Sequence, residues 1–282
     1  MPMRRYYPIL SIAGSDSSGG AGIQADIKTI SSIGCYAMTA ITAITAQNTT
    51  GVAAIQGIDP EIVRAQISTV WADIPPLAVK TGMLFSAPII EQVAAELSHY
   101  HPTHLVVDPV MLSTSGSQLI APDAVECMVT RLFPLAEIVT PNVSEAHALT
   151  GTHDLLGQAL ALRDMGCRNV LLKGGDTDST DFKTDYLLLE NTHKLIPLKA
   201  DAIATRNTHG TGCTLSSAIA SYLALGLDME EAVSRAKLFV VRGLRSGASV
   251  AIGHGHGPMN HLFAPRHMKF QNSHHHDRNN QR

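Results

Sequence analysis

The chain has 282 residues, of which 45% are hydrophobic and 16% are charged, the composition of an ordinary globular domain. Its net charge of -3 offers no basic surface for nucleic acid or an anionic membrane, and no apolar run reaches the ~20 residues of a membrane span. Asp16 interrupts the first apolar stretch too early for a signal peptide, and the four cysteines lack the spacing of a metal site or a disulfide scaffold. We therefore expect a cytoplasmic protein with reduced thiols that binds neither nucleic acid nor a membrane.

Short β-branched runs alternate with longer helical patterns along the chain. The predicted strands cover residues 8–14, 36–46, 51–58, 76–82, 104–110, 136–142, 169–175 and 185–190. The predicted helices cover residues 20–33, 60–72, 87–100, 122–132, 143–150, 155–166, 214–225 and 229–246. This alternation predicts crossover connections around a mostly parallel sheet. We expect one α/β domain over residues 1–264 and a polar, disordered tail over 265–282, whose three consecutive histidines fit a solvated segment better than a metal site.

The first candidate binding segment is the glycine-rich turn "AGSDSSGGAGIQAD" at residues 13–26, which follows a predicted strand and opens a helix. Its glycines let the backbone approach a ligand closely, and the N–H groups of a helix start attract anions. The turn has neither the GxxxxGK[ST] spacing of a P-loop nor the GxGxxG spacing of a dinucleotide fold. A tight strand-to-helix turn that requires small residues explains it equally well.

Two further strand ends carry residues suited to a flat heteroaromatic ring. Gln47 in "AITAQNTTG" offers a donor and an acceptor that match an aminopyrimidine edge. Met83 in "KTGML" can form a floor beneath such a ring. On the residues alone, a turn and a core methionine are the more common explanations of these two positions.

Carboxylates, an amide and a lysine follow the next predicted strands. Asp108 in "VVDPVM" ends a buried strand, where a carboxylate is costly unless it is paired or close to a metal ion. Asn142 and Glu145 in "TPNVSEA" stand three residues apart at a helix start, where they can hold water around Mg²⁺ or form a helix-capping pair. Lys173 in "LLKGGD" is a candidate phosphate contact. Since ligands bind at the carboxyl ends of parallel strands, we expect these side chains to meet there.

The segment "NTHGTGCTLSSA" at residues 207–218 places a cysteine where a polar loop enters a helix of small residues. If Gly210, Thr211, Gly212 and Cys213 form the first helical turn, their N–H groups point at an anion and stabilise a phosphoryl group in transfer. Lowering a thiol pKa from about 8.5 to ~7 needs about 2 kcal/mol, the upper limit of a helix-terminus effect. A cysteine base is therefore feasible here, and an ordinary core cysteine is the alternative.

Taken in this order and with "GHGHGPMNH" near the end, these motifs resemble the hydroxymethylpyrimidine/phosphomethylpyrimidine kinases of thiamine biosynthesis, in the ribokinase-like superfamily. The resemblance implies a three-layer α/β/α sandwich around a central, mostly parallel sheet, without a large lid domain. It implies that ATP, with Mg²⁺, phosphorylates 4-amino-5-hydroxymethyl-2-methylpyrimidine and then its monophosphate. It also implies a homodimer, for which residues 36–58 offer a candidate interface.

The resemblance assigns Gln47 to reading the ring, and it places the rest of the substrate pocket at Gly14, Ala21, Asp26, Met83 and Val110. It places the magnesium–phosphate neighbourhood at Asp108, Asn142 and Glu145, the last two acting through water. It places nucleotide contacts at Lys173, Thr208 and Thr211.

The resemblance also makes Gly210–Cys213 the anion hole and puts Cys213 where many sugar kinases have the aspartate that takes the substrate proton. One departure is Ser17, because the family commonly has proline after the aspartate of its first motif. We expect a more mobile loop there and unchanged activity.

Two alternatives remain beside this interpretation. A pyridoxine or pyridoxal kinase would share the fold, although Gln47, Met83 and Cys213 favour the pyrimidine. A non-catalytic pyrimidine- or nucleotide-binding protein would use the same pocket, but Asp108, Lys173 and the Gly-Thr-Gly turn argue against it because a sensor needs no phosphoryl-transfer site.

Overall fold

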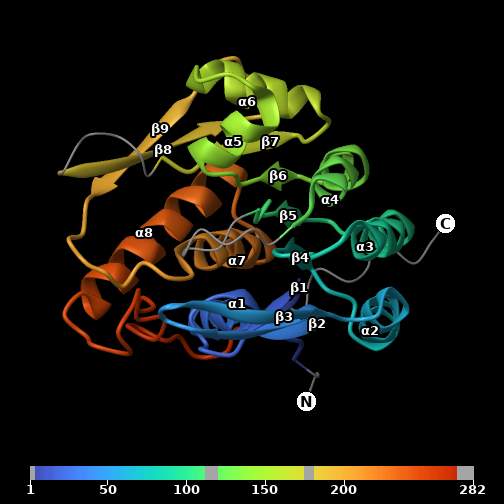
Figure 1. Cartoon of the computed structure of the whole chain (residues 1–282), viewed down its shortest axis with the longest axis horizontal. Helices are drawn as coiled ribbons and strands as arrows, with labels where there is room; N and C mark the ends of the chain where they lie inside the picture. Colours follow the sequence, from blue (N-terminus) through green and yellow to red (C-terminus); the bar gives the residue numbers. More distant parts are fainter. Residues whose placement is uncertain (1–3, 112–119, 175–180, 272–282) are drawn as a thin grey trace.

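The computed structural model describes residues 4–111, 120–174 and 181–271. Its centre is a nine-stranded sheet with the order β3-β2-β1-β4-β5-β6-β7-β8-β9, which Figure 1 shows from β9 to β2. The strands are β1 (Pro8–Asp16), β2 (Tyr36–Asn48), β3 (Gly51–Gly57), β4 (Ala78–Thr81), β5 (Leu105–Val107), β6 (Ile138–Val139), β7 (Asn169–Leu172), β8 (Phe182–Leu188) and β9 (Ile196–Asp201). Strands β2, β1, β4, β5, β6 and β7 pair in parallel, and β3, β8 and β9 add antiparallel pairs at the two edges. The expected mostly parallel α/β sheet is therefore confirmed.

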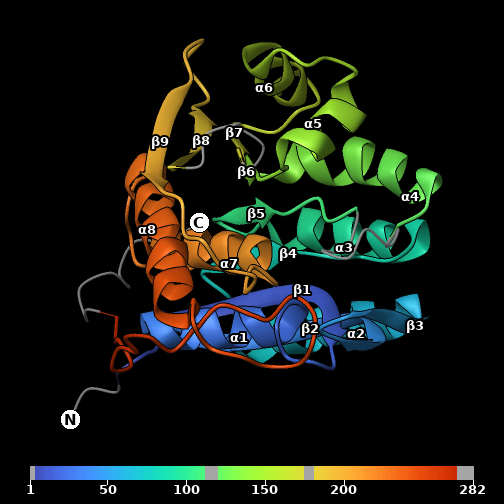
Figure 2. The ribbon, with the colours of Figure 1, turned by 60° about the vertical axis from the view of Figure 1, so that its left-hand side comes forward.

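Helices cover both faces of the sheet (Figure 2). They are α1 (Gly22–Ile33), α2 (Pro60–Asp73), α3 (Ala87–Tyr100), α4 (Pro122–Cys127), α5 (Val143–Thr150), α6 (Leu155–Asp164), α7 (Thr211–Ala224) and α8 (Met229–Gly247), with short turns at Met128–Leu132 and Phe133–Leu135. Buried residues of α1, α7 and α8 form one apolar cluster, and those of α2 to α6 form the other. This is the expected three-layer sandwich, and no separate lid domain occurs in the described ranges.

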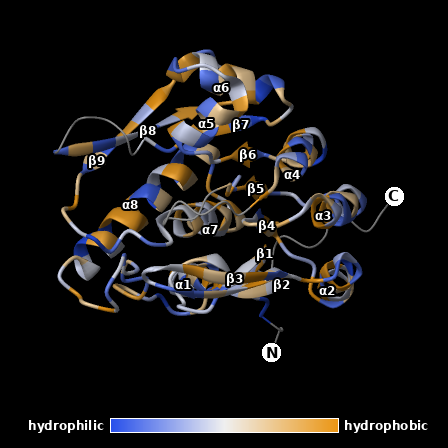
Figure 3. Cartoon of the chain, in the orientation of Figure 1, coloured by the Kyte–Doolittle hydropathy of each residue, from blue (hydrophilic) through white to orange (hydrophobic). Residues whose placement is uncertain are grey.

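Alternate residues of the central strands supply the two apolar clusters. Leu10 and Ile12 of β1 pack toward α2 and α3, whereas Ile9 packs toward α1 and α7. Side chains of a strand alternate between its two faces, so a strand covered on both sides is largely apolar. The central strands accordingly carry hydrophobic residues along their length (Figure 3). This explains why continuous apolar runs in the sequence indicated these strands.

Two segments differ from the sequence-based expectation. Strand β9 was not predicted, because Ile196–Asp201 is a short edge strand whose exposed positions alternate with half-buried ones, and it lacks the continuous apolar run of a central strand. Residues 265–271, expected in a disordered tail, instead bind the chain's first helix and N-terminal segment. The N–H groups of Arg266 and Lys269 donate to the carbonyls of Ser32 and Gly34, both at 2.8 Å. Residues 272–282, with the consecutive histidines, lie outside the described residues.

Within the described ranges, none of the helices combines the length and apolar character that crossing a bilayer requires.

Candidate active site

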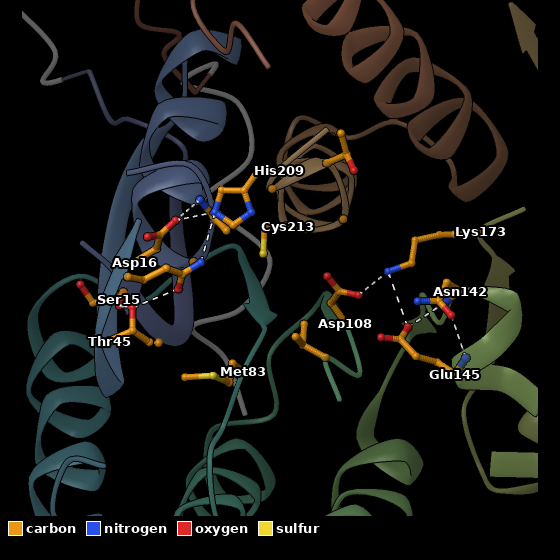
Figure 4. A pocket seen from close by; sticks show the side chains of 18 of the residues that line it. Ser15, Asp16, Thr45, Met83, Asp108, Asn142, Glu145, Lys173, His209 and Cys213 are labelled. Carbon is orange, nitrogen blue, oxygen red and sulfur yellow. Dashed lines mark hydrogen bonds and ion pairs between the residues drawn. The ribbon is translucent and has the colours of Figure 1, made fainter. Parts of the chain in front are cut away.

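The predicted site residues gather around one cavity of about 400 Å³ at the carboxyl ends of the parallel strands (Figure 4). Those that line it are Gly14, Ala21, Gln47, Met83, Asp108, Val110, Asn142, Glu145, Lys173, Gly210, Thr211, Gly212 and Cys213. The cavity also contacts Gly22 of the glycine-rich turn, and Ser15, Asp16, Thr45, Ser144 and His209, which the sequence did not single out as site residues. Sequence segments almost 200 residues apart therefore form a single pocket.

The turn that opens α7 has the geometry of an anion site. Gly210 is the N-cap of α7 and has a positive φ of 78°, a conformation that favours glycine. A Cβ there would lie 1.9 Å from the carbonyl oxygen of Gly20, so the loop that precedes α1 packs directly on this turn. A Cβ on Gly212 would lie 3.3 Å from Nζ of Lys173 and 3.6 Å from a carboxylate oxygen of Asp108. The first turn of α7 thus meets both the glycine-rich loop and the charged side of the cavity.

Lys173 holds together the charged side of the cavity. Its Nζ lies 2.7 Å from Oδ1 of Asp108 and 4.0 Å from Oε2 of Glu145. Burial alone would lower the pKa of Lys173, but the two carboxylates outweigh burial and raise it, so the ammonium stays charged. Burial raises the pKa of Glu145, and Lys173 opposes that rise. The hydroxyl of Ser216 on α7 also donates to Asp108, at 3.3 Å, which ties this group to the anion-binding helix.

Asn142 and Glu145 form the capping pair that the sequence offered as one of two explanations. Oδ1 of Asn142 accepts from the N–H of Glu145 at 2.7 Å, and Oε2 of Glu145 accepts from the N–H of Asn142 at 2.8 Å. Both residues also line the cavity, so capping α5 places them beside Lys173. In the described part of the chain, no cluster of three or more His, Cys, Asp and Glu side chains is arranged to hold a metal ion.

The opposite side of the cavity suits a flat ring. Gly14 donates its N–H to the Met83 carbonyl at 3.1 Å, and a Cβ on Gly14 would lie 2.4 Å from the terminal methyl of Met83. Glycine at position 14 therefore leaves the space that the Met83 side chain occupies. Gln47, at the end of β2, faces Thr45 and His209. Its Oε1 lies 3.1 Å from Thr45 Oγ1, and its Nε2 lies 3.4 Å from His209 Nε2. Ser17 holds Gln47 in place, because its hydroxyl both donates to the Gln47 carbonyl and accepts its N–H, each at 2.8 Å.

Asp16 and His209 join the two glycine-containing loops, and sequence reasoning missed this pair. Oδ2 of Asp16 lies 2.8 Å from Nε2 of His209, and the carboxylate also accepts the N–H groups of Ser18, Gly20 and Ala21. Burial would raise the pKa of Asp16, but His209 and these donors outweigh burial and lower it. Both residues stood inside quoted motifs, but a contact between positions 193 residues apart leaves no local signal.

Asp26 was expected in the substrate pocket, and the structure places it elsewhere. Its side chain is fully buried and absent from the cavity lining, because it forms an ion pair with the equally buried Lys80, Oδ2 to Nζ at 2.8 Å. The hydroxyl groups of Ser11 and Ser217 donate to the same carboxylate. Asp26 therefore links α1, β1, β4 and α7 within the protein interior. Thr208 also lies outside the cavity lining, and its carbonyl accepts the N–H of Thr211 at 3.3 Å.

Cys213 lies between the ring side and the charged side of the cavity (Figure 4). Burial raises the pKa of its thiol to about 11, and Asp26 and Asp108 add to the rise, whereas Lys80 and the N–H of Gly22 lower it. The thiol is thus protonated at neutral pH in the protein without ligands. The positive end of α7 and the Lys80 ammonium do not bring the pKa of this thiol near 7, so the thiolate is a minor species at neutral pH.

Comparison with known proteins places the chain among vitamin kinases. The family model described as phosphomethylpyrimidine kinase matches residues 16–260. The chain is 46% identical to the hydroxymethylpyrimidine/phosphomethylpyrimidine kinase of Rhizobium meliloti, over 90% of this chain and 96% of that protein. It is also 46% identical to the thiamine biosynthesis bifunctional protein ThiED of Geobacter sulfurreducens, over 91% of this chain, but it spans only 52% of that protein.

Solved structures agree with this placement. A phosphomethylpyrimidine kinase from Clostridium difficile superposes with a TM-score of 0.73 at 46% identity, over 84% of this chain and 99% of the other. A pyridoxal kinase from Staphylococcus aureus, solved with AMP-PCP and pyridoxal, gives a TM-score of 0.81 at 33% identity, over 91% of this chain and 94% of the other. The fold is therefore shared by both vitamin kinases, whereas sequence identity and the family model select one of them. The chain belongs to the phosphomethylpyrimidine kinase family.

Proposed function

We propose that this protein transfers the γ-phosphoryl group of ATP to the hydroxymethyl group of 4-amino-5-hydroxymethyl-2-methylpyrimidine, and then phosphorylates the monophosphate to the diphosphate. The observation that carries the proposal is the single cavity that joins Gln47 and Met83 to the Gly210–Cys213 turn. Phosphoryl transfer depends mainly on positioning and electrostatic stabilisation, so the acceptor hydroxyl and the phosphate-binding groups must share one site. The family membership supports the same activity, and the nucleotide analogue in the Staphylococcus aureus structure supports ATP as the donor.

Hydrogen bonds orient the Gln47 amide at the ring side of the cavity. The Thr45 hydroxyl lies 2.9 Å from the Ser15 carbonyl and 3.1 Å from Oε1 of Gln47, which accepts from it. The amide nitrogen of Gln47 therefore faces His209, with 3.4 Å between the two Nε2 atoms. An amide nitrogen carries two N–H donors, so in this orientation Gln47 suits an acceptor on the substrate, such as a ring nitrogen of the pyrimidine.

The charged side of the cavity is the proposed phosphate end. The N–H groups of the α7 turn and the Lys173 ammonium stabilise negative charge on the transferring group. Asp108 and Glu145 bring two carboxylates into a cavity that must also accept nucleotide phosphates. That oxygen donor set fits Mg²⁺ held mainly through water: Asp108 would contact it on the phosphate side, and Asn142 and Glu145 would bind its water ligands. Bound Mg²⁺ would neutralise phosphate charge there, and Cys213 is the proposed acceptor of the hydroxymethyl proton.

The test compares three acceptors with ATP and Mg²⁺: the hydroxymethylpyrimidine, its monophosphate and pyridoxal. We expect turnover of the first two at a much higher kcat/KM than that of pyridoxal. Pyridoxal kinase is the one alternative that a specific observation favours, since the Staphylococcus aureus enzyme shares the fold. Turnover of pyridoxal alone would overturn the pyrimidine assignment, and pyrimidine binding without ATP turnover would overturn the enzymatic one.

The protein is further proposed to act as a cytoplasmic homodimer. Strand β3 forms an edge of the sheet, and Ile44 on the neighbouring β2 is half exposed. An apolar residue at that position favours contact with a second copy of the chain. Light scattering after size exclusion is the test: a dimer that Ile44→Lys converts to a monomer supports this interface, and a monomeric wild type refutes it.

A further inference from the structure

A second cavity, of about 280 Å³, lies on the side of the molecule formed by α1, α7, α8 and the C-terminal segment. Its lining residues are Ser32, Ile33, Tyr222, Arg235, Leu238, Phe239, Arg242, Phe263, Ala264, Arg266 and Lys269. Figure 2 shows α1, α7 and α8 converging on this side of the sheet. Tyr222 stands eleven residues beyond Thr211 on α7, about 16 Å along the helix axis from the catalytic turn. The two cavities are therefore distinct.

Four cationic side chains and no carboxylate line this second cavity. Arg235 is paired with Glu231 one turn earlier on α8, at 2.6 Å. Among the described residues, Arg242, Arg266 and Lys269 have no carboxylate within ion-pair distance. Burial lowers the pKa of Lys269, and Arg266 and Arg235 lower it further, as expected where like charges are crowded together. Such a group of cations gains stability from an anion between them.

Backbone hydrogen bonds and aromatic packing hold the C-terminal segment, and of the four cations Arg242 adds a contact with it through its charged group. The backbone N–H groups of Arg266 and Lys269, rather than their side chains, bind the last carbonyls of α1. Aromatic contacts join α8 to the C-terminal segment across the cavity. The Phe239 and Phe263 rings lie 4.9 Å apart, and the Arg242 guanidinium lies 5.1 Å above the Phe263 ring. The Arg235–Glu231 pair and the Arg242–Phe263 contact therefore hold the cations of α8 in position, while Arg242, Arg266 and Lys269 form no ion pair with the described residues. This is the kind of preorganised surface that binds anions with little ordering cost.

The arrangement of the cations indicates the size of the anion. Arg235 and Arg242 lie seven residues apart on one face of α8, a separation of about 10 Å. Arg266 and Lys269 stand on the other wall, in the C-terminal segment. Arginine guanidinium groups match the oxygen spacing of phosphate in a bidentate manner. A cavity just below the ~300 Å³ at which ordinary ligand pockets begin suits a small anion better than a whole nucleotide.

We propose that the cavity formed by α8 and the C-terminal segment binds a diphosphate group, either as the free ion or as the end of a small ester. One phosphate would bind Arg235 and Arg242, and the other would bind Arg266 and Lys269. The site lies at the far ends of α1 and α7, whose starts form the catalytic cavity. Its occupancy is independent of the proposed kinase activity.

Calorimetric titration of the full-length protein with inorganic diphosphate tests the proposal. The double variant Arg242→Gln/Arg266→Gln should weaken binding at least tenfold and leave kinase turnover unchanged. Lys173→Gln, which alters only the catalytic cavity, should retain the binding. The matched control is Arg245→Gln on the same helix, because Arg245 pairs with Asp201 at 2.9 Å and does not line the cavity.

Several outcomes would overturn the site. The first is failure of the wild type to bind diphosphate at all. Binding that is lost in Lys173→Gln but kept in the double variant would place the diphosphate in the catalytic cavity. Arg245→Gln that weakens binding as much as the double variant would show that the effect is not specific to this cavity. Orthophosphate that binds as tightly as diphosphate would refute the two-phosphate arrangement. Parallel titration with a methyl diphosphate ester separates the two sources: equal affinity for both indicates that an esterified diphosphate is accepted, and binding of the inorganic ion alone indicates the free anion.

Discussion

The raised pKa of Cys213 gives a pH-dependent prediction for the variant Cys213→Ala. Burial raises this pKa to about 11, four units above neutral pH. The thiolate fraction at pH 7 is therefore ~10⁻⁴, and forming the thiolate costs about 5 kcal/mol at ~1.4 kcal/mol per unit. A general base contributes about 10²–10⁴ in rate, or about 3–5 kcal/mol. The free-energy cost of forming the thiolate and the gain from a general base are of similar size. Because that cost falls as the pH approaches the pKa, the contribution of the thiolate to the rate depends on pH.

Since the raised pKa leaves the thiolate available only as pH increases, wild-type kcat should rise about tenfold per unit between pH 7 and pH 9. The ratio of wild-type to Cys213→Ala turnover removes other titrations from the comparison, and it should grow about 100-fold over that interval. The assay is steady-state turnover at saturating pyrimidine, ATP and Mg²⁺. Cys127→Ala is the matched control, because this half-buried thiol on α4 contacts the Ala87 carbonyl and lies outside the cavity.

A ratio that stays constant from pH 7 to pH 9 refutes the proton-acceptor role of the Cys213 thiolate. A ratio near one at both pH values would go further and leave the α7 N–H groups and Lys173 as the only contributors from this part of the site.

Three other changes test the remaining parts of the site. Gln47→Ala should raise the pyrimidine KM by the equivalent of about 1–3 kcal/mol, through loss of a buried hydrogen bond, and an unchanged KM contradicts the ring-reading role. Gly210→Ala should lower kcat at least ~10²-fold because its Cβ collides with the neighbouring loop, whereas Gly226→Ala, with a similarly positive φ and open space, should not. The lowered pKa of Asp16 adds stability that is present above pH ~4 and lost as the pH falls below it. Urea unfolding at pH 6 and pH 3 should therefore show a smaller loss of unfolding free energy in Asp16→Asn than in the wild type. An equal loss in both proteins excludes Asp16 as a source of the pH dependence.

Local patterns were sufficient to predict most of the fold. Continuous apolar runs such as the one in β1 identified the parallel strands, because burial on both faces favours apolar residues at most positions. The motifs at strand ends converged as expected, because parallel strands bring their carboxyl ends to one edge. Strand β9 was missed because an exposed edge strand needs little apolar surface.

The contacts between distant segments could not be predicted in this way. Asp26 belonged to a motif, and its position in the sequence agreed with a pocket residue. Its carboxylate nevertheless points to Lys80, which stands 54 residues further along the chain. The pairing of Asp16 with His209 has the same origin, and so does the contact of Ser17 with Gln47. Each depends on the three-dimensional meeting of two loops rather than on residue spacing.

The buried pair of Lys80 and Asp26 connects this scaffold to the chemistry of the cavity. Burying two charges gains little stability over a well-packed apolar pair, so their contribution to folding alone does not distinguish them from hydrophobic residues. The Lys80 charge also affects the cavity. Among the groups around Cys213, Lys80 lowers the thiol pKa most strongly, whereas burial and the nearby carboxylates raise it. Ser217 of α7 donates to Asp26, so the same pair also fixes the helix that carries Cys213. One buried ion pair thus helps to position the helix that carries the thiol, and it acts on the thiol pKa in both directions, because Lys80 lowers that pKa and Asp26 raises it.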